Sequence, residues 1–301
     1  MFRCIFSKKI TFTASKQNNM DFNLEIFSLV LFIGACFAGF IGSLTGLGGG
    51  VIVIPILTLG FGVDIRYAVG AALVTSIATS SGAAAAYIKE GITNVRIGMF
   101  LEIATTTGAV AGAIVAMYLD KMYIAIILGV VLIFSAIRSV SKKEDGIDYS
   151  APGDKLGEKL KLNGSYPTKD GKVEKYNVHN VIGGYSLMTV AGVLSGLLGI
   201  GSGSLKVLAM DTAMKIPFKV STTTSNFMVG VTAAASAVIY FQRGYIDPGL
   251  AMPIVVGVLL GAFFGSKILP KANVRNLRLL FSVVIFFLAV SMIYNALTGK
   301  M

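Results

Sequence analysis

The chain has 301 residues, of which 54% are hydrophobic and 14% charged, and its mean hydropathy is +0.77. This composition excludes an ordinary soluble globular protein and indicates an integral membrane protein. The net charge of +11 does not indicate nucleic-acid binding, because the basic residues stand mostly at the ends of hydrophobic runs, where they anchor helices at the interface.

Long hydrophobic runs predict an all-α integral membrane protein. A helix rises ~1.5 Å per residue, so about twenty apolar residues cross a ~30 Å hydrocarbon core. The runs do not alternate as barrel strands do. Residues 1–21 precede them and predict an N-terminal tail, or an over-long start before Met20. The predicted spans are 24–44, 67–88, 97–118, 122–140, 181–199, 220–241, 249–269 and 277–297.

Two glycine-rich breaks divide the membrane part into similar halves. The break at 46–50 recurs at 199–203, a shift of 153 residues, and at this shift Tyr87 falls on Tyr240. Apolar stretches at 51–62 and 204–214 follow the breaks and are short for spans. The sequence therefore predicts membrane repeats 22–140 and 180–298, each with about four transmembrane helices and a short broken or re-entrant helix. Parallel repeats with eight spans and inverted repeats with ten spans both fit.

The polar segment 141–179 predicts a soluble linker between the halves. It holds eight Lys and seven Asp or Glu, and Asp170-Gly171 lies between alternating stretches near 159–163 and 172–178. An Asp-Gly turn between such stretches predicts a β-hairpin, which we expect to form a lid on one membrane face. Eight long spans would place both chain ends and this linker on the same side, the cytoplasm.

The glycine breaks are the first candidate substrate site. A break inside hydrocarbon frees backbone N–H and C=O groups, so it persists where it lines a cavity or is buried in protein. Helices that begin at Val51 and Ser204 would direct free N–H groups at an oxyanion; close packing of a kinked helix without a ligand is the alternative. The candidate residues are Gly46, Gly48, Gly49, Gly50, Gly199, Gly201, Ser202, Gly203 and Ser204.

Lys206 is a charged residue inside the second short apolar stretch, where the first repeat has Val53. An intramembrane lysine marks a pathway or a paired site. It would neutralise a bound anion, or else form an ion pair with Asp211 or extend to the surface. Hydroxyl and amide groups near the breaks would add neutral donors, although many such groups bond their own helix. These residues are Thr75, Ser76, Thr223, Thr224, Ser225 and Asn226.

Two acidic residues are candidates for proton coupling. Glu102 lies several residues inside its span, and Asp211 lies in the short apolar stretch after the second break. An intramembrane carboxylate can transfer a proton, but Glu102 could equally pair with Arg96. The cysteines and the single histidine, His179, form no metal or nucleophile motif, so we expect no metal, no cofactor and no enzyme activity.

The chain resembles the TauE/SafE family of permeases, also called the sulfite exporter family. The resemblance rests on the paired breaks, on the string 191–201 and on the Thr-Thr-Thr-Ser-Asn run at 222–226, and it extends from about residue 25 to 297. It implies a multi-pass permease for small, often sulfur-containing anions such as sulfite, sulfoacetate or thiosulfate. Ser202 and Leu208 depart from the family pattern, which has a glycine and a proline there.

Together these features predict a secondary transporter of a small anion, an oxidised sulfur compound, in the cell membrane. The expected partners are the anion and the lipid bilayer, without nucleic acid. An anion channel is the main alternative, and an intramembrane enzyme using Ser204 and Lys206 is a weaker one. Import and export, the coupling ion and the oligomeric state are not set by the sequence.

Overall fold

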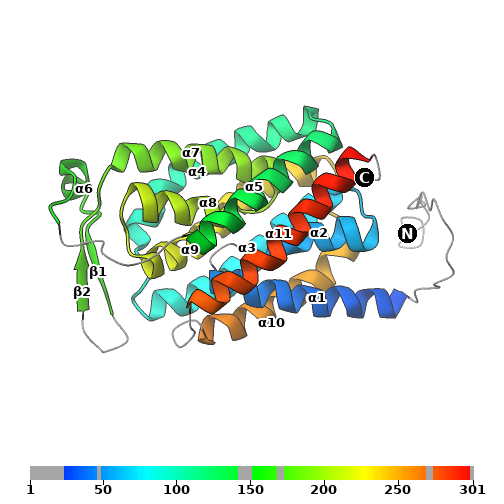
Figure 1. The fold of residues 1–301 in the computed structure, drawn as a ribbon, viewed down its shortest axis with the longest axis horizontal. Helices are drawn as coiled ribbons and strands as arrows, with labels where there is room; N and C mark the ends of the chain where they lie inside the picture. The colour runs from blue at the N-terminus through cyan, green and yellow to red at the C-terminus, as the bar shows by residue number, and fades with distance from the viewer. Residues whose placement is uncertain (1–23, 46–48, 142–150, 168–172, 269–273, 299–301) are drawn as a thin grey trace.

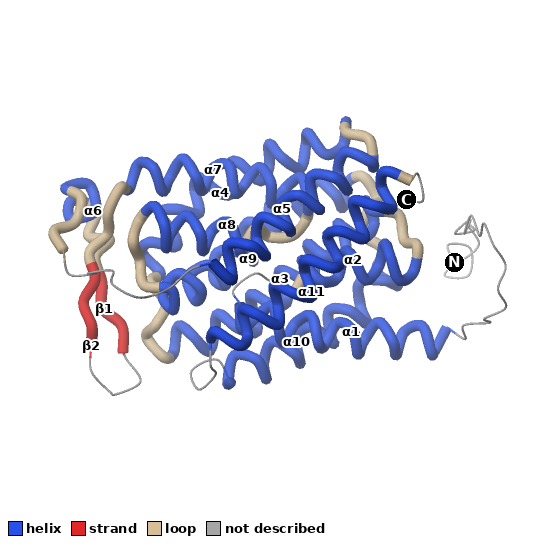
Figure 2. The backbone as a smooth tube through the Cα atoms, in the orientation of Figure 1, coloured by secondary structure: helices blue, strands red, loops and turns tan. Residues whose placement is uncertain are grey.

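The computed structural model describes residues 24–45, 49–141, 151–167, 173–268 and 274–298, and these form helices joined by short loops, with one small antiparallel sheet (Figure 2). The first half contains α1 (Leu24–Thr45), α2 (Gly50–Pro55), η1 (Ile56–Gly60), α3 (Ile65–Lys89), α4 (Val95–Tyr118) and α5 (Lys121–Ser141). The linker contains α6 (Lys155–Lys159), β1 (Gly164–Pro167) and β2 (Val173–Tyr176). The second half contains α7 (Val181–Leu198), α8 (Gly203–Leu208), η2 (Ala209–Ala213), α9 (Phe218–Gln242), α10 (Pro248–Ile268) and α11 (Val274–Leu297).

The long helices are those that the hydrophobic runs predict. Among the described residues, five are long and apolar enough to cross a membrane: α3, α4, α7, α9 and most of α10. The apolar parts of α1, α5 and α11 are shorter within the described residues. The chain is therefore an all-α, multi-pass membrane protein, as predicted. Residues 1–23, which include the predicted tail, lie outside the description.

Helices from the two halves pack against each other in pairs. The pairs are α1 with α10, α4 with α7, α3 with α9, and α5 with α11 (Figure 1). Glycines allow the first two pairs to approach closely: a Cβ atom at Gly112 of α4 would overlap the carbonyl oxygen of Val193 in α7. A Cβ atom at Gly261 of α10 would likewise overlap the carbonyl oxygen of Cys36 in α1. Small residues thus permit contact between backbones, as is common where membrane helices pack.

The linker lies at one end of the helix bundle, whereas α1 begins and α11 finishes at the opposite end (Figure 1). The expectation that chain ends and linker share one side is therefore wrong. The broken helix α8–η2 of the second half explains why the prediction of eight simple crossings fails. The His179 N–H, just before α7, donates to the Met214 carbonyl just after η2 at 3.1 Å. The α8–η2 segment thus returns to the level at which α7 begins, and α7 with this segment adds no net crossing.

The linker packs onto the start of α4. In the sheet, Gly164 pairs with Tyr176 and Pro167 with Val173. The first strand, β1, begins after the stretch 159–163 that the sequence predicts for it. The reason is that residues 155–159 form the helix α6, which the Asp154 side chain caps. The Asn94 side chain donates to Tyr176 Oη at 2.7 Å and to the Leu162 carbonyl at 3.2 Å. Burial raises the pKa of Tyr176 to about 12, although this hydrogen bond opposes the shift.

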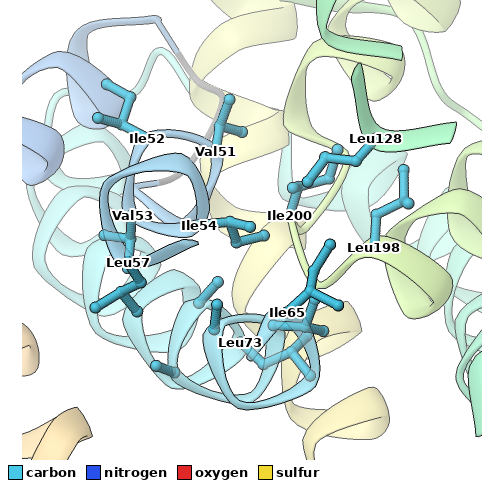
Figure 3. Close-up of a cluster of buried hydrophobic side chains, with 14 of the residues drawn as sticks. Val51, Ile52, Val53, Ile54, Leu57, Ile65, Leu73, Leu128, Leu198 and Ile200 are labelled. Carbon is cyan, nitrogen blue, oxygen red and sulfur yellow. The ribbon is translucent and has the colours of Figure 1, made fainter. Parts of the chain in front are cut away.

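Apolar side chains surround the first broken helix. All six residues of α2 are buried. Figure 3 shows Ile54 of α2 in one cluster with Ile200, which belongs to the second glycine break. A short helix with a proline in its last turn has little stability of its own. Its stability therefore depends on this apolar packing, which also holds the two breaks close together.

Candidate functional site

The two glycine breaks meet at one side chain of α3, Ser76. A Cβ atom at Gly50 would lie 2.7 Å from Ser76 Oγ, and a Cβ atom at Gly201 would lie 3.5 Å from the same oxygen. Ser76 is fully buried, and among the described residues its hydroxyl has no hydrogen-bond partner. The backbones of both breaks therefore face one unpaired hydroxyl in the interior of the bundle.

The second break has an unusual backbone conformation. Gly199 and Gly201 have φ values of 68° and 65°, and Ser202 has φ 45° and ψ 30°. This left-handed region is easy for glycine and costs energy for serine. Ser202, the departure from the family pattern, thus keeps a glycine-like conformation and adds a fully buried hydroxyl without a partner in the described part of the chain. Strain of this kind is concentrated at functional sites.

Several buried polar atoms of α3, α9 and the second break lack partners in the described residues. They are the hydroxyls of Ser76, Ser202 and Thr222 and the side-chain oxygen of Asn226. An unpaired buried donor or acceptor costs about 1–3 kcal/mol, so such a group calls for an explanation such as a water or a ligand. The Thr222 and Asn226 side chains are each 1% exposed. The unpaired atoms belong to α3, α9 and the second break and therefore come from both halves of the chain.

Ser225 and Asn226 connect α9 to the second break and to the last turn of α1. Ser225 Oγ donates to the Gly203 carbonyl at 3.1 Å, and Asn226 Nδ2 donates to the Ser43 carbonyl at 3.1 Å, near the end of α1. Ser80 on α3 donates to the Asn226 carbonyl at 2.5 Å. On the first break, the Gly49 N–H donates to Thr79 Oγ1 at 3.2 Å.

Lys206 forms a second polar cluster with residues of α4 and α9. Its ammonium is fully buried and donates to Thr232 Oγ1. Thr232 Oγ1 lies 2.6 Å from Glu102 Oε1, which also accepts a hydrogen bond from Thr106 Oγ1 at 3.0 Å. Thr105 Oγ1 lies 3.5 Å from the same threonine oxygen. One buried hydroxyl therefore links the lysine to the glutamate.

The alternative pairings considered for these charges are not observed. Within the described residues no ion pair joins Lys206 to Asp211, which is buried in η2. Arg96 donates to the Lys161 carbonyl at 2.9 Å, and the Glu102 carboxylate accepts from the two threonines. Lys206 does not extend to the surface either, because its side chain is 0% exposed.

The remaining candidate hydroxyls bond their own helices or the linker end, although the Thr75 methyl group lies against Gly49 of the first break, and a few candidates lie outside the described residues. The Thr75 hydroxyl donates to the Ala71 carbonyl, and that of Thr223 donates to the carbonyls of Lys219 and Val220, so both bond their own helices. Thr224 Oγ1 accepts from the Asn94 N–H at 3.1 Å, at the linker end. Gly46, Gly48 and the side chain of Ser204 lie outside the described residues.

The sequence did not single out Thr232 or Thr106. Thr232 precedes an alanine-rich run that reads as helix packing, and a lone membrane threonine commonly bonds its own helix. One signal was present, because Thr232 falls on Thr79 at the shift of 153 residues. These two aligned threonines, Thr79 and Thr232, each contact the broken helix of their own half. Thr79 accepts a hydrogen bond from the Gly49 N–H, and Thr232 accepts one from Lys206.

Broken helices whose breaks meet at buried polar groups inside a helical membrane protein are a construction used by membrane transporters. The chain belongs to the sulfite exporter TauE/SafE family, which matches residues 31–292. It is 26% identical to the probable membrane transporter protein YunE of Bacillus subtilis, over 89% of this chain and 98% of that protein. It is also 26% identical to YdhB of the same organism over 82% and 92%, and 24% identical to MJ0441 of Methanocaldococcus jannaschii over 88% and 95%. Both of these are likewise named probable membrane transporter proteins. No solved structure matches the chain.

Proposed function

We propose that the protein is a secondary transporter of a small anion, an oxidised sulfur compound such as sulfite, thiosulfate or a sulfonate, which binds between the two glycine breaks. The observation that carries this proposal is Lys206. A fully buried ammonium beside the second break supplies the positive charge that a desolvated anion needs. The unpaired hydroxyls of Ser76 and Ser202 supply neutral donors nearby.

We further propose that residues 22–140 and 180–298 are inverted repeats. The helix pairs support a two-fold relation between the repeats, because each long helix of one half packs on a long helix of the other and the pairs exchange under the shift of 153 residues. When each helix is replaced by its counterpart 153 residues away, the pair α1–α10 is replaced by the pair α7–α4. The pairs α3–α9 and α5–α11 are each replaced by themselves. In Figure 1, α5 and α11 run in opposite directions, as inverted copies would. Rocking one set of pairs against the other would expose the breaks alternately to the two sides.

A binding and flux assay tests the proposal. Purified protein is screened by thermal shift against sulfite, thiosulfate, sulfate, sulfoacetate and taurine, and hits are tested for counterflow in proteoliposomes. We expect stabilisation by at least one oxidised sulfur anion, with saturable exchange. Lys206→Met should abolish both, whereas Val53→Met at the corresponding position of the first half should retain them. Conductance without exchange would indicate an anion channel, and stabilisation equal in Lys206→Met and wild type would refute the site.

A further inference from the structure

We infer that Glu102 and the transported anion compete for Lys206, so that each anion enters the site together with a proton that neutralises Glu102. This inference rests on the proposed anion transport and adds its coupling ion. Three features support it: the polarity of the Lys206–Thr232–Glu102 chain, the unused positions at both of its ends, and the charge balance of a buried site.

The hydrogen-bond chain has the polarity of a charged pair. Lys206 Nζ is a donor only, so Thr232 Oγ1 accepts from it. The threonine hydroxyl has one proton, and the shortest of its possible acceptor contacts is Glu102 Oε1 at 2.6 Å, compared with 3.0 Å for the Met228 carbonyl. The order ammonium, hydroxyl, carboxylate places a positive and a negative charge at the two ends, separated by one side chain.

Both ends of the chain have unused hydrogen-bonding positions. An ammonium has three N–H donors, and in the described residues Lys206 gives one of them to Thr232. Glu102 uses Oε1 for two threonine hydroxyls, while Oε2 is buried without a partner among the described residues. The free donors of Lys206 suit an anion, and the free oxygen of Glu102 suits a proton.

Charge balance connects these two positions. Without an anion, Lys206 and Glu102 sum to zero charge. An arriving anion would leave a net negative charge in a site where Lys206 is 0% and Glu102 8% exposed, which is costly. A proton from the solvent that bonds to Glu102 Oε2 removes one unit of this negative charge and frees Lys206 for the anion, so a monovalent anion is fully balanced and a divalent anion leaves one negative charge for the neutral hydroxyl donors to stabilise. Release on the other side reverses both steps, so one proton moves with each anion.

The chain has one such pair rather than two. At the shift of 153 residues, Lys206, Glu102 and Thr105 fall on Val53, Val255 and Val258, and only Thr232 finds a threonine, Thr79. The corresponding position of the first half is therefore apolar and holds no proton or anion. This asymmetry fixes the stoichiometry at one proton for each anion.

Other titratable groups around α4 have different surroundings. α4 packs against α7 and α9. The ring of Tyr185 on α7 packs on Phe100 at 5.4 Å, and Tyr240 on α9 donates to the Leu197 carbonyl at 3.2 Å. Lys219 lies thirteen residues before Thr232 on α9, about 20 Å along the helix. Asp211 in η2 is the remaining buried carboxylate near Lys206 in the described residues and is tested separately below.

The experiment uses purified full-length protein in proteoliposomes, with the membrane potential held at zero by potassium and valinomycin. The probes are radiolabelled thiosulfate and sulfoacetate, because their charges do not change between pH 6 and 8 as that of sulfite does. With one proton per anion, a gradient of one pH unit should drive accumulation of up to about tenfold. Glu102→Gln should lose this accumulation and keep anion–anion exchange, since Lys206 remains. Glu102→Asp should restore accumulation, and Glu90→Gln, the same change at an exposed residue, should behave as wild type.

The outcomes separate the two proposals. Exchange by wild type without accumulation driven by the pH gradient would overturn the coupling and leave anion transport standing. Absence of exchange for every anion of the panel would overturn both. Accumulation that survives in Glu102→Gln and is lost in Asp211→Asn would move the proton site to Asp211. A measurement on wild type alone needs no variant: calorimetry in two buffers of different ionisation enthalpy should show one proton taken up per anion bound, and zero would overturn the inference.

Discussion

Removing Lys206 should destabilise the protein through Glu102, and removing both charges should restore most of the loss. Lys206→Met leaves the Glu102 carboxylate buried and without its cation, and breaking a buried pair from one side is strongly destabilising. Glu102→Gln leaves the Lys206 ammonium buried and without its anionic partner. The double variant contains no buried charge at this position and keeps threonine hydroxyls to bond the new amide.

The magnitude follows from the geometry. Two hydrogen bonds in series separate the charges by about 5 Å. At an effective dielectric constant of about 20, the attraction is about 3 kcal/mol. Each single variant should therefore lose about this much free energy of unfolding, and the double-mutant cycle should give a coupling of similar size. Independent sites would instead add to within about 0.5 kcal/mol.

The assay is an unfolding titration with SDS in mixed micelles, followed by a thiol-reactive dye in a Cys4→Ser background. The dye then reports on Cys36, which lies half-buried in α1. Additive losses for Lys206→Met and Glu102→Gln would refute the pairing through Thr232. The cycle of Lys206→Met with Asp211→Asn is the matched control, and we expect no rescue there. Rescue by Asp211→Asn would show that the ion pair considered from sequence is the one that operates.

Three further predictions concern the breaks, the linker and the topology. Gly50→Ala should impair transport and stability, because the new Cβ would lie 2.8 Å from a backbone carbonyl of α3. In the control Gly60→Ala the new Cβ meets nothing within 4 Å, so this variant should be neutral. Equal melting temperatures of the two variants would contradict the prediction. Tyr176→Phe should cost about 1 kcal/mol and speed proteolysis of the linker, because a buried hydrogen bond is lost, whereas Tyr166→Phe, near the exposed side of the hairpin, should not; equal rates would show that this bond is unimportant. Cysteines placed in α6 and at the end of α11 should label from opposite sides of the membrane, and labelling from one side would contradict the bundle in Figure 1.

The positions of the helices could be predicted from sequence, but their paths could not. Each hydrophobic run became a helix within a few residues, because burial in lipid leaves the backbone no other way to satisfy its hydrogen bonds. Whether a run crosses the membrane or turns back is decided by what its end contacts. The hydrogen bond from His179 to Met214, which places the end of η2 at the level at which α7 begins, joins residues far apart in sequence, and no local pattern announces it.

The candidate site divides in the same way. Lys206 and Glu102 could be selected individually, since a charge in a hydrophobic run is conspicuous. Their connection could not, because it depends on how α8, α4 and α9 face one another around Thr232. The hydroxyls of Thr75 and Thr223 are predicted from sequence as donors of the site, but in the structure they bond their own helices. They looked equivalent to Ser76 in composition, yet their rotations on the helix direct them to carbonyls of the preceding turn.

The close pairing of α1 with α10 has a consequence for how the chain is made. About 200 residues separate the end of α1 from the start of α10, and ribosomes add ~5–20 residues per second. The face of α1 that packs on α10 thus remains without this partner for roughly 10–40 seconds, until α10 has been synthesised. During that interval the nascent helix is accompanied only by lipid, by earlier parts of the same chain or by the insertion machinery. Slowing translation after α5 should lengthen this exposed stage, and we expect α1 to be the first segment at which quality-control proteases capture unfinished molecules.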